Sequence, residues 1–188
     1  MSVSTVISEE KLRYPIGRFE PLKVVSPDHH EAWLRDLEQL PSKLRQAVAG
    51  LNDRQLDTPY RSGGWTVRQV VHHYPDSHLN AYTRFRLALT EDSPVVKTYE
   101  EARWAELADA RTAPIEISLA LLEGLHARWT TLLRSLGEGD FARTFKHPEW
   151  GEITLDWALG LYAWHSRHHV AHITSLRDRE GWQAPPRA

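Results

Sequence analysis

Four histidines lie within nine residues near the C-terminal end of the chain, in a segment whose apolar residues otherwise follow a helical period. At 3.6 residues per turn, His165 and His169 fall one turn apart in the middle of the apolar stripe, and His168 is rotated by roughly 80° to its edge. Imidazoles one turn apart can bind one metal ion from the same side. Burying both without a partner would be unfavourable, so the spacing predicts a metal site that takes a third ligand from another element.

A second group of histidines offers that third ligand. His72 and His73 flank opposite edges of the apolar stripe of another predicted helix, and His78 lies near its centre. Periodicity alone does not choose among the three. Asp76 follows His73 by three residues and His72 by four, so its carboxylate is a candidate for a hydrogen bond that fixes a histidine tautomer.

Composition sets limits on the class of protein. The 188 residues are 41% hydrophobic and 26% charged, which is typical of a globular chain, and we expect a single domain spanning 1–188. A formal net charge of −2 leaves no basic excess for nucleic acid. The absence of cysteine excludes disulfides and thiolate ligands, so any thiol chemistry would need a thiol from the substrate. Without a signal-like or membrane-spanning apolar run, a cytoplasmic location and no membrane partner are expected.

Four amphipathic helices can position the two histidine groups. The predicted helices span about residues 26–52, 66–89, 114–136 and 154–180. Ser26, Thr66 and Thr154 are suitable N-cap residues. Pro41 predicts a kink or a break in the first helix, and Pro75 predicts a bend in the second, close to the histidines.

The third predicted helix has a broad apolar side. Pro114 suits its first turn, and Gly137 suits its end. Its stripe is expected to run from Ile117 or Leu121 through Leu122 towards the C-terminal end, and these side chains are expected in the core.

The segments outside the four predicted helices show less regular sequence patterns. Residues 1–25 read as an extended N-terminal arm, residues 100–110 as a possible short extra helix, and residues 138–153 as a loop without a strand. This loop and the second helix carry polar and aromatic residues expected near a pocket mouth, namely His147, Glu149, Trp150 and His78. The pattern therefore predicts an all-α four-helix bundle.

Longer motifs around both histidine groups resemble the DinB superfamily and, within it, the YfiT-like metal-dependent hydrolases. The two most specific motifs are Trp65-Thr-Val-Arg-Gln-Val-Val-His-His73, followed by Asp76-Ser-His78, and Trp164-His-Ser-Arg-His-His-Val-Ala-His172. Further matching segments are Tyr14–Gly17, Asp57–Arg61, Leu119–Leu122, His126–Trp129 and Ala158–Tyr162. The resemblance covers residues 14–182.

This resemblance implies a four-helix bundle that holds a divalent metal, zinc or nickel, on three histidines. One ligand comes eight positions after the tryptophan that opens the second helix, and two come from the HxxxH of the last helix. Carried over to this chain, the ligands are His73, His165 and His169. Pro75 replaces a residue that is commonly small in relatives, so His72 is the alternative on the second helix. His172 lies where distant relatives often carry glutamine and is not counted as a ligand.

The function that follows is a metal-dependent hydrolase acting on a small-molecule substrate. Three imidazoles leave one coordination position of zinc for water, whose pKa the ion lowers towards about 7. The alternatives are a metal-dependent S-transferase that uses a low-molecular-weight thiol, and a metal-binding stress protein without turnover. The family resemblance also implies a homodimer, with which exposed aromatics such as Trp104 and Trp150 are compatible.

Overall fold

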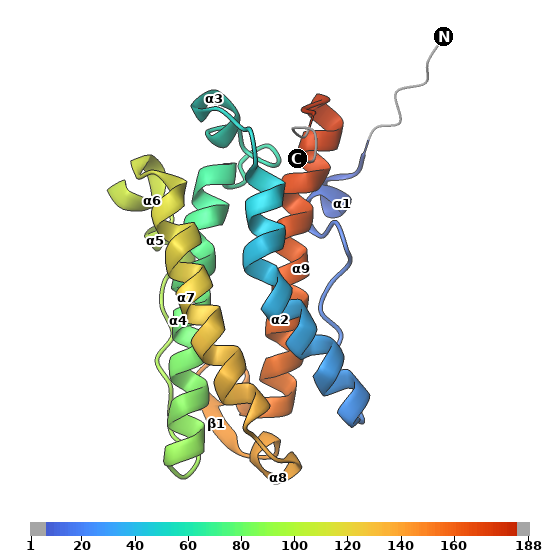
Figure 1. Ribbon diagram of the computed structural model, residues 1–188, viewed down its shortest axis with the longest axis vertical. Helices are drawn as coiled ribbons and strands as arrows, with labels where there is room; N and C mark the ends of the chain where they lie inside the picture. Colours follow the sequence, from blue (N-terminus) through green and yellow to red (C-terminus); the bar gives the residue numbers. More distant parts are fainter. Residues whose placement is uncertain (1–6, 184–188) are drawn as a thin grey trace.

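Four long helices form the body of the computed structural model, which describes residues 7–183 (Figure 1). They are α2 (Pro27–Val48), α4 (Val67–Thr90), α7 (Ile115–Arg134) and α9 (Leu155–Glu180). Helix α2 packs against α7 and α9, and α7 packs against α4. Helices α4 and α9 contact each other less extensively and complete the bundle. The predicted four-helix bundle is confirmed.

The ends of these helices follow from local sequence. The Thr66 side chain accepts a hydrogen bond from the Gln69 backbone N–H at 3.1 Å, and the Gln69 side chain accepts one from the Thr66 N–H at 2.9 Å. Thr154 likewise caps α9 by accepting from the Trp157 N–H. Gly181 ends that helix with a φ of 66°, a left-handed conformation that glycine adopts without strain.

Both internal prolines lie within continuous helices. Helix α2 continues through Pro41, so of the two predicted alternatives, a kink or a break, the break is wrong. Helix α4 continues through Pro75, and its helical register is therefore maintained from His73 to His78. Proline removes one backbone donor, but packing of the long helices on their neighbours can offset that local loss.

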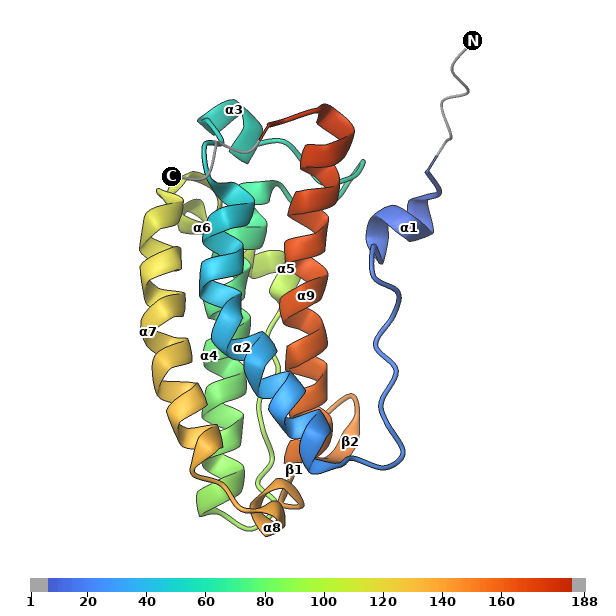
Figure 2. The same cartoon turned by 45° about the vertical axis from the view of Figure 1, so that its right-hand side comes forward.

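Short helices lie at the ends and edges of the bundle. They are α1 (Glu9–Arg13), α3 (Asp53–Leu56), α5 (Glu101–Trp104), α6 (Ala108–Thr112) and α8 (Glu138–Phe141). The predicted extra helix between α4 and α7 is thus present as two, α5 and α6. The predicted arm of residues 1–25 is described from residue 7 and runs along the outside of α9 (Figure 2); residues 1–6 lie outside the described part.

A two-stranded hairpin precedes α9, where the sequence pattern predicted only a loop. Strand β1 (Thr144–His147) pairs antiparallel with β2 (Gly151–Thr154). Phe145 and Ile153 are partners in the register, and both are buried. Each strand has only four residues, too few for an alternating pattern to stand out, so the pairing depends on the tertiary surface beneath it.

The core consists of two apolar clusters separated by a layer of imidazoles. One cluster contains Leu37, Phe85 and Trp129, and the other contains Leu40, Leu122 and other residues of the opposite half of the bundle. Along α4 and α9, His78, His165 and His169 lie between the residues of the two clusters. The exposed fractions of Ile117 and Leu121 are 62% and 52%, so their predicted burial is wrong. Across the described residues, the helices lack the combination of length and apolar character that crossing a bilayer requires.

Candidate metal centre

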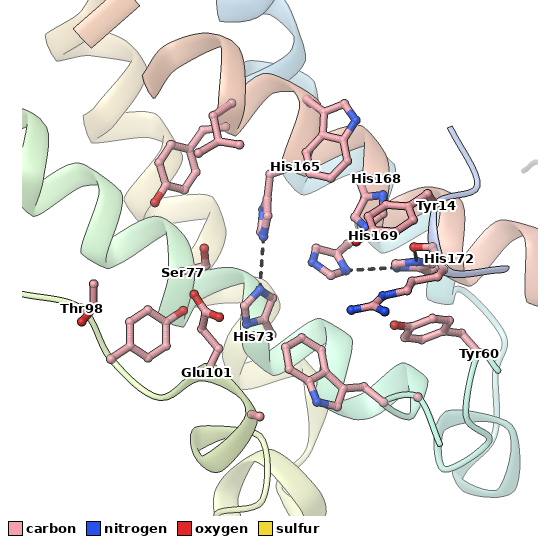
Figure 3. A pocket seen from close by; sticks show the side chains of 18 of the residues that line it. Tyr14, Tyr60, His73, Ser77, Thr98, Glu101, His165, His168, His169 and His172 are labelled. Atoms are coloured by element: carbon pink, nitrogen blue, oxygen red, sulfur yellow. Dashed lines mark hydrogen bonds between the residues drawn. The ribbon is translucent and has the colours of Figure 1, made fainter. Parts of the chain in front are cut away.

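A pocket of about 620 Å³ lies beside α4 and α9, with four histidines of α9 and one of α4 in its wall (Figure 3). The segment after α3, the segment leading into α5 and the N-terminal arm supply other parts of the lining. The pocket therefore combines the two histidine groups that the sequence analysis singled out with side chains from distant parts of the chain.

His73, His165 and His169 converge in this pocket. Each offers one ring nitrogen, and these three atoms lie within 4.8 Å of one another. The Nε2 atoms of His73 and His165 are 3.2 Å apart. Trp65 packs against the His73 ring, with the ring centroids 4.7 Å apart. Figure 3 shows the side chains of α4 and α9 approaching each other across the pocket.

Burial keeps these imidazoles neutral at ordinary pH. Loss of solvation lowers the pKa of His73 to about 4. The same cause, reinforced by the neighbouring imidazoles, lowers the pKa of His165 and that of His169 well below the ordinary value. Each ring therefore retains an unprotonated nitrogen near pH 7, which is the form that binds a metal.

His72, the alternative ligand on the second helix, lies on a different side of α4. Its Nδ1 is 2.7 Å from the Ser118 hydroxyl oxygen, and its Nε2 donates to the Ala113 carbonyl at 3.1 Å. Both ring nitrogens are thus engaged with α7 and the segment before it. The structure places His73 in the cluster and His72 outside it.

The other histidines of α9 lie next to the cluster. His172 donates from Nε2 to the Arg13 carbonyl at 3.0 Å, and His168 stacks on Trp164 with ring centroids 4.3 Å apart. His168, His169 and His172 form a second group whose candidate ligand atoms also lie within 4.8 Å of one another. His169 belongs to both groups.

Two expected positions differ in the structure. His78 is fully buried behind His165, so the expectation that it lines the pocket mouth is wrong. Burial raises the pKa of the half-buried Asp76 to about 6. Among the hydrogen bonds of residues 7–183, the Asp76 carboxylate has none to a histidine; the Nδ1 of His165 is paired with the Nε2 of His78 instead.

The hairpin contributes to the pocket as expected. His147, Glu149 and Trp150 all belong to its lining. The rings of His147 and Trp150 stack with centroids 4.1 Å apart. The loop that the sequence analysis placed near the pocket mouth therefore reaches the pocket, although it does so as a hairpin.

Arg84 is a pocket residue that the sequence analysis missed. It is buried on α4 and donates to the Lys97 carbonyl at 3.0 Å and to the Tyr162 hydroxyl at 3.4 Å. Its position follows His73 by eleven residues and Ser77 by seven, so the three share one helical face. This spacing was the feature of the sequence that could have identified Arg84 as a pocket residue.

Together, the fold and the site define a four-helix bundle protein with a cluster of buried and half-buried histidines in the wall of a pocket. The family model of the DinB superfamily matches residues 36–173, which is more than half of the chain. The chain belongs to the DinB superfamily.

The chain is similar over most of its length to proteins from two bacilli. YfiT of Bacillus subtilis (strain 168) is 56% identical over 172 residues, which cover 91% of this chain and 97% of YfiT. A relative from Bacillus mycoides (strain KBAB4) is 54% identical over 171 residues, covering 91% of this chain and 98% of the relative. The resemblance to the YfiT-like subfamily is confirmed.

Solved structures agree with the fold. The structure of YfiT, described as "a probable metal-dependent hydrolase with an unusual four-helix bundle topology", matches with a TM-score of 0.90 and 55% identity over 92% of this chain and 99% of that one. TT2238, described as a four-helix bundle protein, matches with a TM-score of 0.55 and 23% identity over 78% of this chain and 98% of that one. The second likeness supports the fold alone.

Proposed function

We propose that this chain is a mononuclear metal-dependent hydrolase in which His73, His165 and His169 hold a divalent ion. The observation that carries the proposal is the convergence of three neutral imidazoles from two helices in the wall of a pocket. The description of YfiT as a probable metal-dependent hydrolase supports it. Zinc is the first candidate and nickel the second, since imidazole suits both.

The residues present fit such an ion. Two nitrogens that bind one tetrahedral zinc at about 2.0–2.1 Å lie about 3.3 Å from each other. The separation of 3.2 Å between the Nε2 atoms of His73 and His165 agrees with that value. The ligand set contains nitrogen alone, as it must in a chain without cysteine.

In the proposed reaction, the ion activates water, and the pocket residues orient the substrate. An ion on three neutral histidines supplies an activated water near neutral pH. Arg84 presents a buried guanidinium at the pocket wall, held in place by the Lys97 carbonyl and the Tyr162 hydroxyl. We propose that it orients an acyl or other electron-rich oxygen of the substrate, because a preorganised cation stabilises negative charge that develops there. The aromatic side chains of the pocket exclude water from the remainder of the substrate.

Metal content tests the ligand assignment. We expect the full-length chain, loaded with zinc and dialysed, to retain about one ion per chain, and His73→Ala, His165→Ala and His169→Ala each to lose most of it. His72→Gln is the matched control, because His72 is also buried on α4 but contacts Ser118 instead of the cluster. Unchanged zinc content in the three alanine variants, or equal loss in His72→Gln, would contradict the assignment.

Activity separates the three candidate functions. Zinc-dependent cleavage of a panel of activated esters and amides without added thiol would support the hydrolase. Zinc-dependent consumption of a low-molecular-weight thiol only when an electrophile is present would support the S-transferase instead. Zinc binding with neither reaction would support a binding protein. Arg84→Met should reduce kcat with little loss of zinc if Arg84 acts on the substrate, and an unchanged kcat would exclude that role.

A further inference from the structure

The two α9 histidines of the candidate metal centre each place the second ring nitrogen against another imidazole. The Nδ1 of His165 lies 3.0 Å from the Nε2 of His78, and the Nδ1 of His169 lies 3.2 Å from the Nδ1 of His172. Metal-binding histidines usually donate this second N–H to a carboxylate, a carbonyl or a water, which fixes the tautomer. Here an imidazole takes that place, and imidazole can either donate or accept.

Behind His165, a chain of imidazoles ends on a backbone carbonyl. The Nδ1 of His78 lies 2.8 Å from the Nε2 of His126, and the Nδ1 of His126 lies 2.7 Å from the carbonyl oxygen of Leu37. A carbonyl oxygen only accepts, so His126 must carry its proton on Nδ1. A neutral imidazole has one N–H, and therefore the Nε2 of His126 accepts from His78. By the same rule, the Nε2 of His78 accepts from the Nδ1–H of His165.

A shorter chain gives the same result behind His169. The Nε2 of His172 lies 3.0 Å from the carbonyl oxygen of Arg13 and donates to it. The Nδ1 of His172 is then an acceptor, and it accepts from the Nδ1–H of His169. The Nε2 atoms of His165 and His169 are therefore both left without a proton.

Burial supports this ordering of protons. His78, His126 and His172 are at most 2% exposed, and a charged imidazolium would lose its solvation there. Loss of solvation lowers the pKa of His126 to about 4. Each of these rings accordingly has one proton near pH 7, as the ordering requires.

We propose that His78, His126 and His172 are positioning residues that hold His165 and His169 in the Nδ1–H tautomer, with both Nε2 lone pairs directed at one ion. The proposal rests on the metal centre proposed above and deepens it. The longer chain joins α9, α4, α7 and α2 in turn, so the packing of the whole bundle sets the orientation of one ligand. A neutral imidazole behind the ligand adds no negative charge near the ion. It therefore offsets less of the positive charge of the ion than a carboxylate in the same place would.

Paired substitutions at His126 and His172 test the proposal without altering a proposed ligand. His126→Leu removes the acceptor for His78, whereas His126→Gln retains an oxygen acceptor in place of Nε2. Likewise, His172→Leu removes the Nδ1 acceptor for His169, whereas His172→Asn retains an oxygen acceptor in its place. We expect both leucine variants to bind zinc about 10–100-fold more weakly in competition with a chelator, and the amide variants to recover most of that loss. His72→Leu, a buried substitution away from the cluster, should leave zinc affinity unchanged.

A second readout uses the metal-free, full-length chain. Long-range ¹H–¹⁵N NMR distinguishes a protonated from an unprotonated ring nitrogen, and we expect protonated Nδ1 and unprotonated Nε2 in both His165 and His169. The amide variants should preserve this pattern, while His126→Leu should abolish it for His165 alone. Since this measurement needs neither metal nor turnover, it decides the tautomers even if a leucine variant fails to fold or the chain binds no zinc.

The outcomes separate the two proposals. Wild-type protein that shows the Nδ1–H tautomers but binds no zinc would overturn the metal centre and leave the ordering of protons intact. Tight zinc binding with Nε2–H on metal-free His165, or with unchanged affinity in folded His126→Leu, would overturn the positioning role. Two zinc ions per chain, with one lost in His172→Asn, would show that His172 binds a second ion together with His168 and His169. That result would overturn the positioning role of His172.

Discussion

Adjacent histidines on α4 illustrate how one residue's position determines its role. A step of one residue rotates a side chain by about 100° around a helix. His72 therefore reaches Ser118 on α7, while His73 reaches His165 on α9. The difference lies in the helix opposite each ring, since both rings are buried and both belong to the same turn.

The buried histidines predict how the stability of the metal-free chain depends on pH. Unfolded histidines bind a proton as the pH falls below about 6.5, whereas His73, His126 and His172 stay neutral down to about pH 4 in the folded chain. The unfolded state thus binds more protons between these values. The free energy of unfolding should therefore decrease as the pH falls from about 6.5 to 4, by up to about 1.4 kcal/mol per pH unit for each histidine.

Urea titrations of the chelator-treated chain across this pH window measure the effect, and a constant free energy of unfolding would contradict it. His126→Gln should make the decrease shallower. Asp76 acts in the opposite direction, because burial raises its pKa to about 6 and the folded state then holds the additional proton. Asp76→Asn should consequently make the decrease steeper.

At the scale of the element, α9 carries most of the candidate site and has well-defined ends. Thr154 caps its N-terminus, directly after the hairpin whose residues reach the pocket. Gly181 ends it in a left-handed conformation. Between these ends, His165 and His169 lie one turn apart, so the helix alone sets the spacing of two of the three proposed ligands.

The N-cap of α9 provides a direct prediction. Thr154→Ala removes the side-chain acceptor of the Trp157 N–H and should lower the free energy of unfolding by about 1 kcal/mol. Thr174→Ala, an exposed substitution within the same helix, should be neutral or slightly stabilising because alanine has the higher helix propensity. Chemical denaturation compares the two, and an equal effect in both variants would show that the cap contributes nothing.

At the scale of the whole molecule, two apolar clusters enclose the imidazole layer. Leu122 and Leu121 are adjacent on α7, but their exposed fractions are 0% and 52%. Leu122→Ala should lower the free energy of unfolding by about 2–5 kcal/mol, because it leaves a cavity between packed helices. Leu121→Ala should change it by less than about 0.5 kcal/mol. Similar losses in both variants would contradict the packing described for α7.

A homodimer stays a prediction, as does the single domain spanning the whole sequence. Trp104 and Trp150, the aromatics that were compatible with a dimer, are 39% and 48% exposed. Trp150 also lines the pocket and stacks on His147. The exposed surface of Trp150 therefore lies at least in part within the candidate site.

Local sequence determined much of this protein. The four helices, the caps at Thr66 and Thr154 and the spacing of His165 and His169 depend on contacts within a few residues, which a helical period and a capping pattern encode directly. The family resemblance, not the spacing, selected His73 over His72. The central position of His78 on its stripe was also visible, although its partner was not.

Tertiary structure alone decided which side chains from different helices meet. The approach of His73 to His165 and the chain from His165 through His78 and His126 to the Leu37 carbonyl join residues distant in sequence. The hairpin before α9 pairs neighbouring segments, but Phe145 and Ile153 are buried against side chains from the helices. Such contacts depend on the rotation and offset of each packed element, and these follow from how the side chains of all four helices interlock. A periodic pattern specifies the face of one helix but not the residue that will lie opposite it.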